Sequence, residues 1–450
     1  MVLRIRMNTV FLRWRRFVIT AALILGVCLG SAWTVKARAE TGGVYRARNG
    51  TVYTDPNSEG WVWVPDGVRV VRGLIFLTIA KEKLDFSRTT SWMLRPNSEL
   101  ARGVDFALGG PGDWTSQQKN FDRLATLGAL SGHPEIANAS WCWDGFSHMG
   151  QKFYAYMDLH PERVIAMISS FGGMHERGVK SAGAQLNHVL ANAGQVDFWH
   201  RPPNLIGIVA DNRPTGARWQ TAMWEGVGHG GGNNASYGHL FFQEAIRARY
   251  PAGASPLAGP VTLTNAPESS GWLCDMPGRN NGFNGKLYAW ADYPSNRAAA
   301  CWFANKDLAF AYRGATVYAA NRFTDKLPNG CSISMAPTTS GDTANYYSPS
   351  ETLQFSVHHV NWTKWQKVEF YDGGTKLGEL KGTNGTICAR RPQPGVHAFT
   401  AVATDGEGHE KYSNMIAFYV KKEQALQLLK DARVDIKSPE LRKMNSTRQP

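Results

Sequence analysis

Apolar and polar positions follow two different patterns along the chain. Over residues 41–255, short apolar runs alternate with stretches of helical periodicity, which is typical of a mostly parallel sheet with crossover helices. The apolar runs predict strands at 61–64, 74–79, 140–143, 164–169, 205–209 and 223–227. We expect an α/β domain over 41–255, followed at 256–340 by an extension and linker rich in Gly, Asn and Trp.

The second pattern covers residues 341–420, where short alternating strands are separated by glycine-rich turns. Strands are predicted at 353–357, 367–371, 396–403 and 415–420. This spacing favours a small all-β sandwich. In the charged tail, 421–450, the pattern predicts one short helix over 423–432.

The N-terminal segment has the pattern of an export signal. A basic stretch ending in Arg15-Arg16 precedes an apolar run over 17–35, and Ala37 and Ala39 are the small residues that a signal peptidase reads. We expect a signal peptide over 1–39 and a bacterial protein that is secreted, periplasmic or at the cell surface. A retained membrane anchor stays open as the alternative, because the run approaches the ~20 residues that span a bilayer.

Charge and cysteine content narrow the classes of protein. The formal net charge is +13, but seven basic residues and no acidic residue fall within the first 39 positions, so nucleic-acid binding is not expected. Export permits disulfides. Cys142 lies in a predicted buried strand and is expected to be a free thiol, whereas Cys274 and Cys301 are the preferred pair on sequence proximity alone. No CxxC or HExxH is present, so neither a metal nor another cofactor is expected.

Ser147 lies where a predicted strand meets a predicted helix. The apolar run at 140–143 leads into Gly145-Phe146-Ser147, and the following helical stretch stops at Pro161. A serine at such a sharp turn has its hydroxyl pushed clear of the sheet, and small neighbours let strand and helix approach. This run resembles the nucleophile elbow of the α/β-hydrolase superfamily, G-x-S-x-G, with the second glycine displaced to Gly150 by Met149.

The resemblance implies a Ser-His-acid triad with Ser147 as the nucleophile. His229 is the expected base, since it follows an apolar segment, is flanked by glycines and precedes a helix predicted over 237–249. Asp211 is the expected acid because it ends the apolar run at 205–209. Only 18 positions separate it from His229, so Asp197 and Glu225 stay open as substitutes.

The same resemblance implies an oxyanion hole made of backbone N–H groups. One is that of His148, next to the nucleophile, and the other lies near Ala80 or Lys81, after the strand predicted at 74–79. The entry Val64-Pro65-Asp66-Gly67 and the segment at 131–136 resemble secreted carboxylesterases related to feruloyl esterases and polyester depolymerases. His133, within that segment, is expected to be structural.

The segment at 341–420 resembles the bacterial immunoglobulin-like domain of extracellular enzymes. The runs at 368–378 and 395–405 carry this resemblance, which implies a spacer or adhesion unit without catalytic residues. Contact with a cell wall or polysaccharide would come through this domain. Trp362 and Trp365 are candidates for stacking on sugar rings, although a place in the core or its rim is favoured for them.

The expected activity is hydrolysis of a carboxylic ester, small or polymer-linked, through an acyl-enzyme. Two alternatives stay open. One is a hydrolase fold that has lost activity and binds carbohydrate or cell wall, which Met149 and the short spacing from Asp211 to His229 favour. The other is a serine peptidase or amidase, which the same triad can support.

Overall fold

The computed structural model describes most of the chain between Gly43 and Val420. The described ranges are 43–47, 50–58, 60–77, 106–110, 117–172, 181–194, 196–198, 201–224, 227–230, 235–277, 285–324, 332–337, 346–347, 352–358, 365–381, 385–390 and 395–420. All the described helices and strands belong to one compact unit, which begins at Val44. The predicted signal segment and tail helix lie outside the described residues. No helix within the described ranges is both long and apolar enough to cross a membrane.

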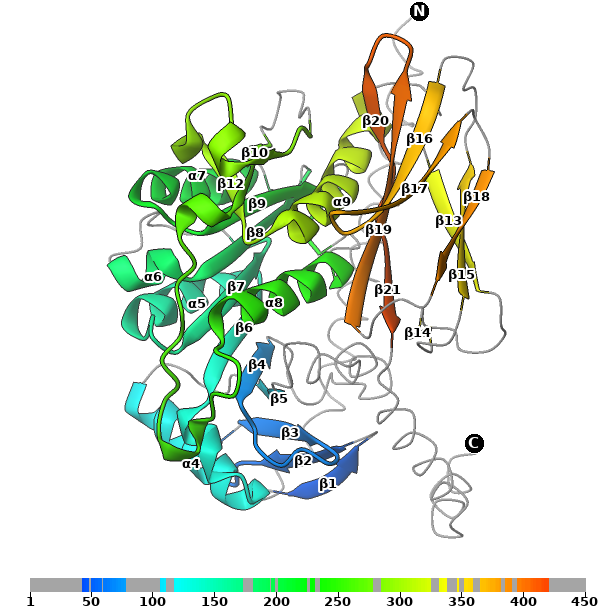
Figure 1. Ribbon diagram of the computed structural model, residues 1–450. Helices are drawn as coiled ribbons and strands as arrows, with labels where there is room; N and C mark the ends of the chain where they lie inside the picture. Colours follow the sequence, from blue (N-terminus) through cyan, green and yellow to red (C-terminus); the bar gives the residue numbers. More distant parts are fainter. Residues whose placement is uncertain are drawn as a thin grey trace, which may run out of the picture. The chain divides into compact units, whose positions relative to one another are not determined.

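The largest sheet of the described chain has nine strands in the order β1-β2-β3-β5-β4-β6-β7-β8-β9 (Figure 1). These are β1 (Val44–Ala47), β2 (Gly50–Thr54), β3 (Trp61–Pro65), β4 (Gly73–Leu77), β5 (Phe106–Gly110), β6 (Ser140–Phe146), β7 (Val164–Ser170), β8 (His188–Gly194) and β9 (Trp219–Trp224). Pairings from β1 to β3, and of β3 with β5, are antiparallel. All pairings from β5 through β9 are parallel, as predicted.

Helices cover both faces of this sheet. One face carries α4 (Gln117–Ser131), α5 (His148–Leu159), α6 (Ala182–Leu186) and α7 (Arg201–Asn212), whereas the other carries α8 (Ala235–Arg249) and α9 (Lys306–Thr324). Short 3-10 turns are η2 (Pro134–Asn138), η3 (Arg213–Thr215), η4 (Pro256–Ala258), η5 (Glu268–Ser270), η6 (Trp290–Asp292) and η7 (Arg297–Ala299). The two apolar layers between helices and sheet form the core.

Two predictions of strands need correction. The run at 205–209 lies inside α7, where Leu205, Ile208 and Val209 form a buried stripe at helical spacing. The strand predicted at 223–227 begins earlier, at Trp219, and ends at Trp224. The strand β8 was not predicted: all seven of its residues are buried, so it has no alternating pattern, and its sequence HVLANAG is poor in β-branched residues.

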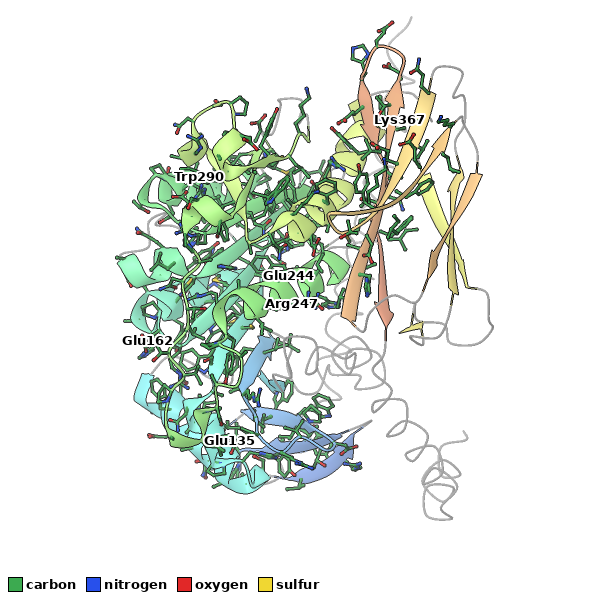
Figure 2. All side chains as sticks on the ribbon, viewed as in Figure 1. Glu135, Glu162, Glu244, Arg247, Trp290 and Lys367 are labelled. Carbon is green, nitrogen blue, oxygen red and sulfur yellow. The ribbon has the colours of Figure 1, made fainter. Side chains whose placement is uncertain are left out.

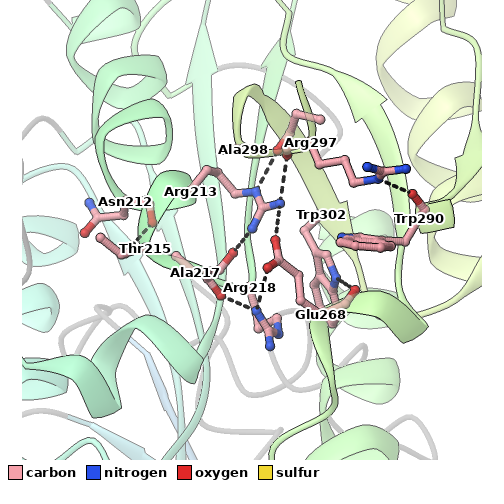
Figure 3. A network of polar contacts seen from close by, with 12 residues as sticks. Asn212, Arg213, Thr215, Ala217, Arg218, Glu268, Trp290, Arg297, Ala298 and Trp302 are labelled. Carbon is pink, nitrogen blue, oxygen red and sulfur yellow. Dashed lines mark hydrogen bonds and ion pairs between the residues drawn. The ribbon is translucent and has the colours of Figure 1, made fainter. Parts of the chain in front are cut away.

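The first part of the extension predicted at 256–340 packs beside β9 through its strand β12. Its three-stranded sheet consists of β10 (Trp272–Asp275), β11 (Tyr288–Ala289) and β12 (Ala300–Phe303). The buried Arg213 guanidinium holds it in place by donating to Ala300 O at 2.7 Å. It also donates to the Glu268 carboxylate at 2.8 Å (Figure 3). Such charge-assisted bonds satisfy a cation that would otherwise be buried without partners.

Cysteine pairing differs from the prediction. Cys274 and Cys301 are opposite each other on β10 and β12, but both are free thiols, so the expected disulfide is absent from the structure. Cys142 is a free, buried thiol, as predicted. Burial raises the pKa of Cys301 to about 11, which keeps this thiol protonated and poorly reactive at neutral pH.

The C-terminal segment forms two further sheets (Figure 1). One consists of β13 (Ser332–Pro337), β15 (Thr352–His358) and β18 (Gly385–Arg390). The other contains β14 (Tyr346–Tyr347), β16 (Trp365–Asp372), β17 (Thr375–Lys381), β19 (Gly395–Asp405), β20 (Glu410–Tyr412) and β21 (Ile416–Val420). The two sheets lie against each other, which confirms the predicted small all-β sandwich beside an α/β domain.

This sandwich shares its core with the α/β domain. Val396 and Ala398 of β19 belong to the same buried cluster as Phe241 of α8. The buried Gln243 amide accepts the N–H of Val396 at 3.1 Å and donates to its carbonyl at 3.4 Å. Next to it, Glu244 pairs with Arg247 at 2.8 Å (both labelled in Figure 2). The sandwich is therefore part of the packed body of the protein, whereas the resemblance implied a spacer.

Candidate active site

Ser147 occupies a strained turn between β6 and α5. It is one of two non-glycine residues in the described chain with positive φ, with φ 54° and ψ −127°, and α5 begins at the next residue. Its N–H donates to Ser170 O of β7 at 2.8 Å. An L-residue is held in this region only where its surroundings impose it, and such strain gathers at functional sites. The geometry is that of a nucleophile elbow.

The glycine at 150 supplies the close approach that the elbow requires. A Cβ on Gly145 would lie 2.8 Å from Gly150 Cα, and a Cβ on Gly150 would lie 2.7 Å from Ser169 Oγ. Strand and helix therefore meet at Gly145 and Gly150. Met149 is only partly buried and packs against the apolar layer under α5. The displaced glycine preserves the elbow, so Met149 does not obstruct it.

The structure brings His229 to Ser147. The imidazole Nε2 lies 3.0 Å from Ser147 Oγ, which is hydrogen-bond distance. His229 lies on the loop after β9. This loop passes close to the end of β8 because Gly194 has no side chain: a Cβ there would lie 2.5 Å from Val227 O. About a quarter of the imidazole is exposed, at 27%.

Asp197, and not Asp211, is the carboxylate beside His229. The Nδ1 atom of His229 lies 3.2 Å from the Asp197 carboxylate, whose side chain is fully buried. Asp211 is exposed on α7, so its predicted place at the end of a strand is wrong. Glu225, the other substitute, lies outside the described residues.

The order Ser147, Asp197, His229 leaves room for a helix between the candidate acid and the candidate base. The two lie 32 positions apart in the chain, and α7 and β9 occupy the interval. Asp197 follows β8 directly and so stands at the carboxyl end of a parallel strand, where ligand and catalytic groups gather in such sheets. The sequence offers Asp197 only as a substitute, and the fully buried strand β8 before it has no alternating pattern.

The predicted oxyanion donors have different outcomes. His148 is the first residue of α5, so its N–H lies ahead of the i→i−4 hydrogen bonds of the helix. This N–H and the helix dipole favour negative charge at this position. Ala80 and Lys81 lie outside the described residues. His133 bonds to Glu135 at 2.9 Å, as fits the structural role predicted for it.

A second carboxyl group lies three residues before the nucleophile. Asp144 stands on β6 between Leu77 of β4 and Ile168 of β7. Burial raises its pKa to about 6, because the apolar surroundings disfavour the ionised form. Sequence patterns gave no signal for this group.

A cluster of potential metal ligands occurs elsewhere among the described residues. Ligand atoms of Asp405, Glu407 and His409 lie within 4.8 Å of one another at the turn from β19 to β20. The Asp405 carboxylate accepts the N–H groups of Glu407 and His409 at 2.9 Å and 2.8 Å. These bonds account for the arrangement of the turn, which is a common exposed hairpin.

The fold is that of an α/β hydrolase: a mostly parallel sheet, helices on both faces, and a serine at the sharp turn after a central strand. Comparison with solved structures finds likenesses to proteins of this class. A feruloyl esterase module from Clostridium thermocellum is 13% identical over 46% of this chain and 86% of that one, with a TM-score of 0.29. A thermostable carboxyl esterase from Bacillus coagulans is 9% identical over 46% and 96%, with a TM-score of 0.28.

The β-sandwich has likenesses of its own. Fibronectin(III)-like modules of Clostridium thermocellum CbhA are 21% identical over 20% of this chain and 94% of that one, with a TM-score of 0.17. At these identities and TM-scores, none of the likenesses carries an argument about activity. No family model matches the chain. No curated protein matches it either.

Proposed function

We propose that the protein is an exported serine hydrolase of carboxylic esters. The observation that carries this proposal is the continuous chain of contacts from Ser147 through His229 to the buried Asp197, at 3.0 Å and 3.2 Å. Serine, imidazole and carboxylate in this order make up an activated nucleophile. Ser147 also has a strained backbone and directly precedes the N-terminus of α5.

The proposed reaction proceeds through an acyl-enzyme. Ser147 Oγ attacks the ester carbonyl while His229 Nε2 takes the hydroxyl proton, and the negative charge moves to the carbonyl oxygen. Collapse of this intermediate expels the alcohol, which receives the proton from His229. Water, deprotonated by His229, then attacks the acyl-enzyme. Collapse of this second intermediate releases the acid and expels Ser147 Oγ, which receives the proton back from His229. Asp197 orients the imidazole and stabilises its protonated form.

The N–H of His148 is the proposed donor to the developing oxyanion. One such donor contributes about 10²–10³-fold to kcat in serine hydrolases. No metal or other cofactor enters these steps. Because this donor belongs to the backbone, its contribution depends on the conformation of the turn at Ser147.

The reasons to suspect an inactive fold lose force against these contacts. Gly150 takes the close-approach position, so Met149 does not displace the elbow. The short spacing from Asp211 to His229 no longer matters once Asp197 is the acid. A peptidase or amidase remains an outcome of the experiment below, since amide substrates use the same groups.

The test is hydrolysis of p-nitrophenyl acetate and butyrate by the protein produced with its own N-terminal segment. Ser147→Ala is compared with Ser269→Ala, a serine exposed on η5. We expect activity to fall to background in the first variant and to stay near wild type in the second. A folded wild type no faster than Ser147→Ala would contradict the proposal. Faster cleavage of matched p-nitroanilides would make the protein an amidase.

A further inference from the structure

Three phenylalanine rings surround the His229 imidazole. The ring centroids of Phe146, Phe198 and Phe171 lie 5.1 Å, 5.6 Å and 6.0 Å from that of His229. They come from three separate places in the sequence: the end of β6, the loop after β8 and the residue after β7. The topology of the parallel sheet brings these three strand ends together at its carboxyl edge.

Two of these rings are open to solvent. Phe146 is 41% exposed and Phe198 is 57% exposed, and nearby Val196 is 63% exposed. We call Phe146, Val196 and Phe198 the apolar rim. Each is a direct or near neighbour of a triad residue in the sequence: Phe146 precedes Ser147, and Val196 and Phe198 flank Asp197. Grouped exposed apolar residues of this kind often mark a binding surface.

Val196 and Phe198 of the rim are hydrogen-bonded to the segments that carry His229 and Asp197. Val196 donates its N–H to Val227 O at 3.1 Å, on the loop that carries His229. Phe198 donates its N–H to the Asp197 carboxylate at 2.7 Å. These bonds fix the rim relative to the imidazole, so it has a defined place beside the nucleophile.

The third ring, that of Phe171, is buried and packs beside the rim. Phe171 is 2% exposed and lies 5.7 Å from Phe146, centroid to centroid. It is the second non-glycine residue in the described chain with positive φ, at 58°. After it, Gly172 cannot be replaced freely, because a Cβ there would lie 2.5 Å from Ser147 O. A strained backbone that places a buried ring beside both Phe146 and His229 indicates a required position.

We infer that Phe146 and Phe198 bind an apolar group of the ester beside the scissile carbonyl. This inference rests on the proposed function and names its substrate class: esters whose acyl group is alkyl or aryl, as opposed to a charged or sugar group. An ester carbonyl at Ser147 Oγ brings its neighbouring atoms next to the rim. The rim side chains offer no charge and no hydroxyl, so burial of apolar surface is the interaction that they can supply.

The test is the dependence of kcat/KM on acyl length in p-nitrophenyl acetate, butyrate and hexanoate. Each methylene that becomes fully buried is worth about a fourfold gain, and a half-covered methylene about twofold. For the wild type we expect kcat/KM to rise about two- to fourfold per methylene. A charged ester of similar length, p-nitrophenyl hemisuccinate, should be a poorer substrate than the butyrate.

Phe198→Ala is expected to flatten this rise, chiefly through a larger KM for the hexanoate. Phe198→Leu keeps apolar surface and should retain most of the rise. Leu130→Ala, which removes a 44% exposed leucine from α4, is the matched control and should keep the wild-type rise. A loss of kcat on all esters alike, with no change in the chain-length rise, would mean that Phe198 supports the triad and does not bind substrate.

The outcomes separate this inference from the proposed function. No hydrolysis of any ester by the folded wild type contradicts the proposed function, and the inference falls with it. Serine-dependent hydrolysis with a flat or falling response to acyl length contradicts the inference alone. A rise of kcat/KM with acyl length that persists unchanged in both Phe198→Ala and Phe146→Ala also contradicts the inference alone, because the apolar group would then bind elsewhere.

Discussion

The identity of the triad acid is the sharpest question at the scale of single residues. Asp197→Asn keeps the size of the side chain but removes the charge that orients His229. We expect kcat for p-nitrophenyl butyrate to fall by about 10³–10⁴-fold. Asp211→Asn, on the exposed side of α7, is the control and should stay near the wild-type rate. The reverse ranking of the two variants would restore Asp211 as the acid.

Asp144 gives a prediction for pH. Burial raises its pKa to about 6, so the folded protein favours the protonated carboxyl. The stability that this preference contributes is full below the carboxyl's ordinary pKa of about 3.9 and is lost as pH rises through 6. Asp144→Asn should therefore raise Tm relative to wild type more at pH 8 than at pH 4, measured by scanning calorimetry. An equal difference in Tm at pH 4 and pH 8 would contradict a raised pKa of Asp144.

The sequence predicts Ser147 and His229 as a pair because both stand in strong local patterns, and the structure places their side chains 3.0 Å apart. The serine follows an apolar strand and precedes a helix, and glycines flank the histidine. Asp197 has no such pattern. It follows β8, whose Asn192 and His188 are buried polar residues that break the apolar run. Packing between two neighbouring strands makes this segment a strand, and that information is not local.

At the scale of elements, the meeting of β6 and α5 depends on two glycines. Gly150→Ala adds a Cβ 2.7 Å from Ser169 Oγ, a contact that real structures do not show. The Ser169 hydroxyl must shift, and the Gly145 carbonyl oxygen, 3.2 Å from the same Cβ, leaves the helix little room. We expect the start of α5, and the Ser147 hydroxyl with it, to be displaced. We expect a loss of kcat greater than tenfold. Met149→Gly restores the usual elbow spacing and tests whether Met149 obstructs the site. It should leave activity within a few-fold of wild type.

The segment at 205–209, predicted as a strand, is part of the helix α7. Its apolar residues are nearly continuous, so a short buried strand and a buried helix face look alike. Pro202 and Pro203, which suit the first turn of a helix, are the local signal for α7. A helix over Arg201–Asn212 places Asp211 in its last turn and not at the end of a strand.

The N-terminal segment makes a prediction of its own. Cleavage after Ala39 yields a mature protein that begins at Glu40. N-terminal sequencing of protein recovered from the periplasm or culture fluid is the measurement, with Ala39→Arg as the variant that should block cleavage. Full-length protein found only in the membrane fraction would favour a retained anchor.

At the scale of the whole molecule, the β-sandwich and the α/β domain are joined by buried contacts. Gln243 satisfies both backbone groups of Val396, and Gly374 donates its N–H to Asp307 at the start of α9. Removing a buried partner leaves the other group without a hydrogen bond. The two parts are therefore expected to unfold together.

Gln243→Ala tests this coupling. We expect a loss of about 1–3 kcal/mol in the free energy of unfolding, because Val396 keeps two buried groups without partners. Gln366→Ala, exposed on β16, is the control and should change stability little. Calorimetry of the wild type should give one transition. Two separate transitions, with no shift in Gln243→Ala, would mean that the sandwich is an independent spacer.

The central claim is that Ser147 is a nucleophile activated by His229 and Asp197. The most direct measurement is the reaction with a p-nitrophenyl alkylphosphonate, which phosphonylates an activated serine and releases p-nitrophenolate. The account predicts one equivalent of p-nitrophenolate per protein and a phosphonyl adduct on the peptide that contains Ser147. Labelling should be slowed by orders of magnitude in His229→Ala and in Asp197→Asn. Absence of an adduct in the folded wild type, or equal labelling of all three proteins, would contradict the claim.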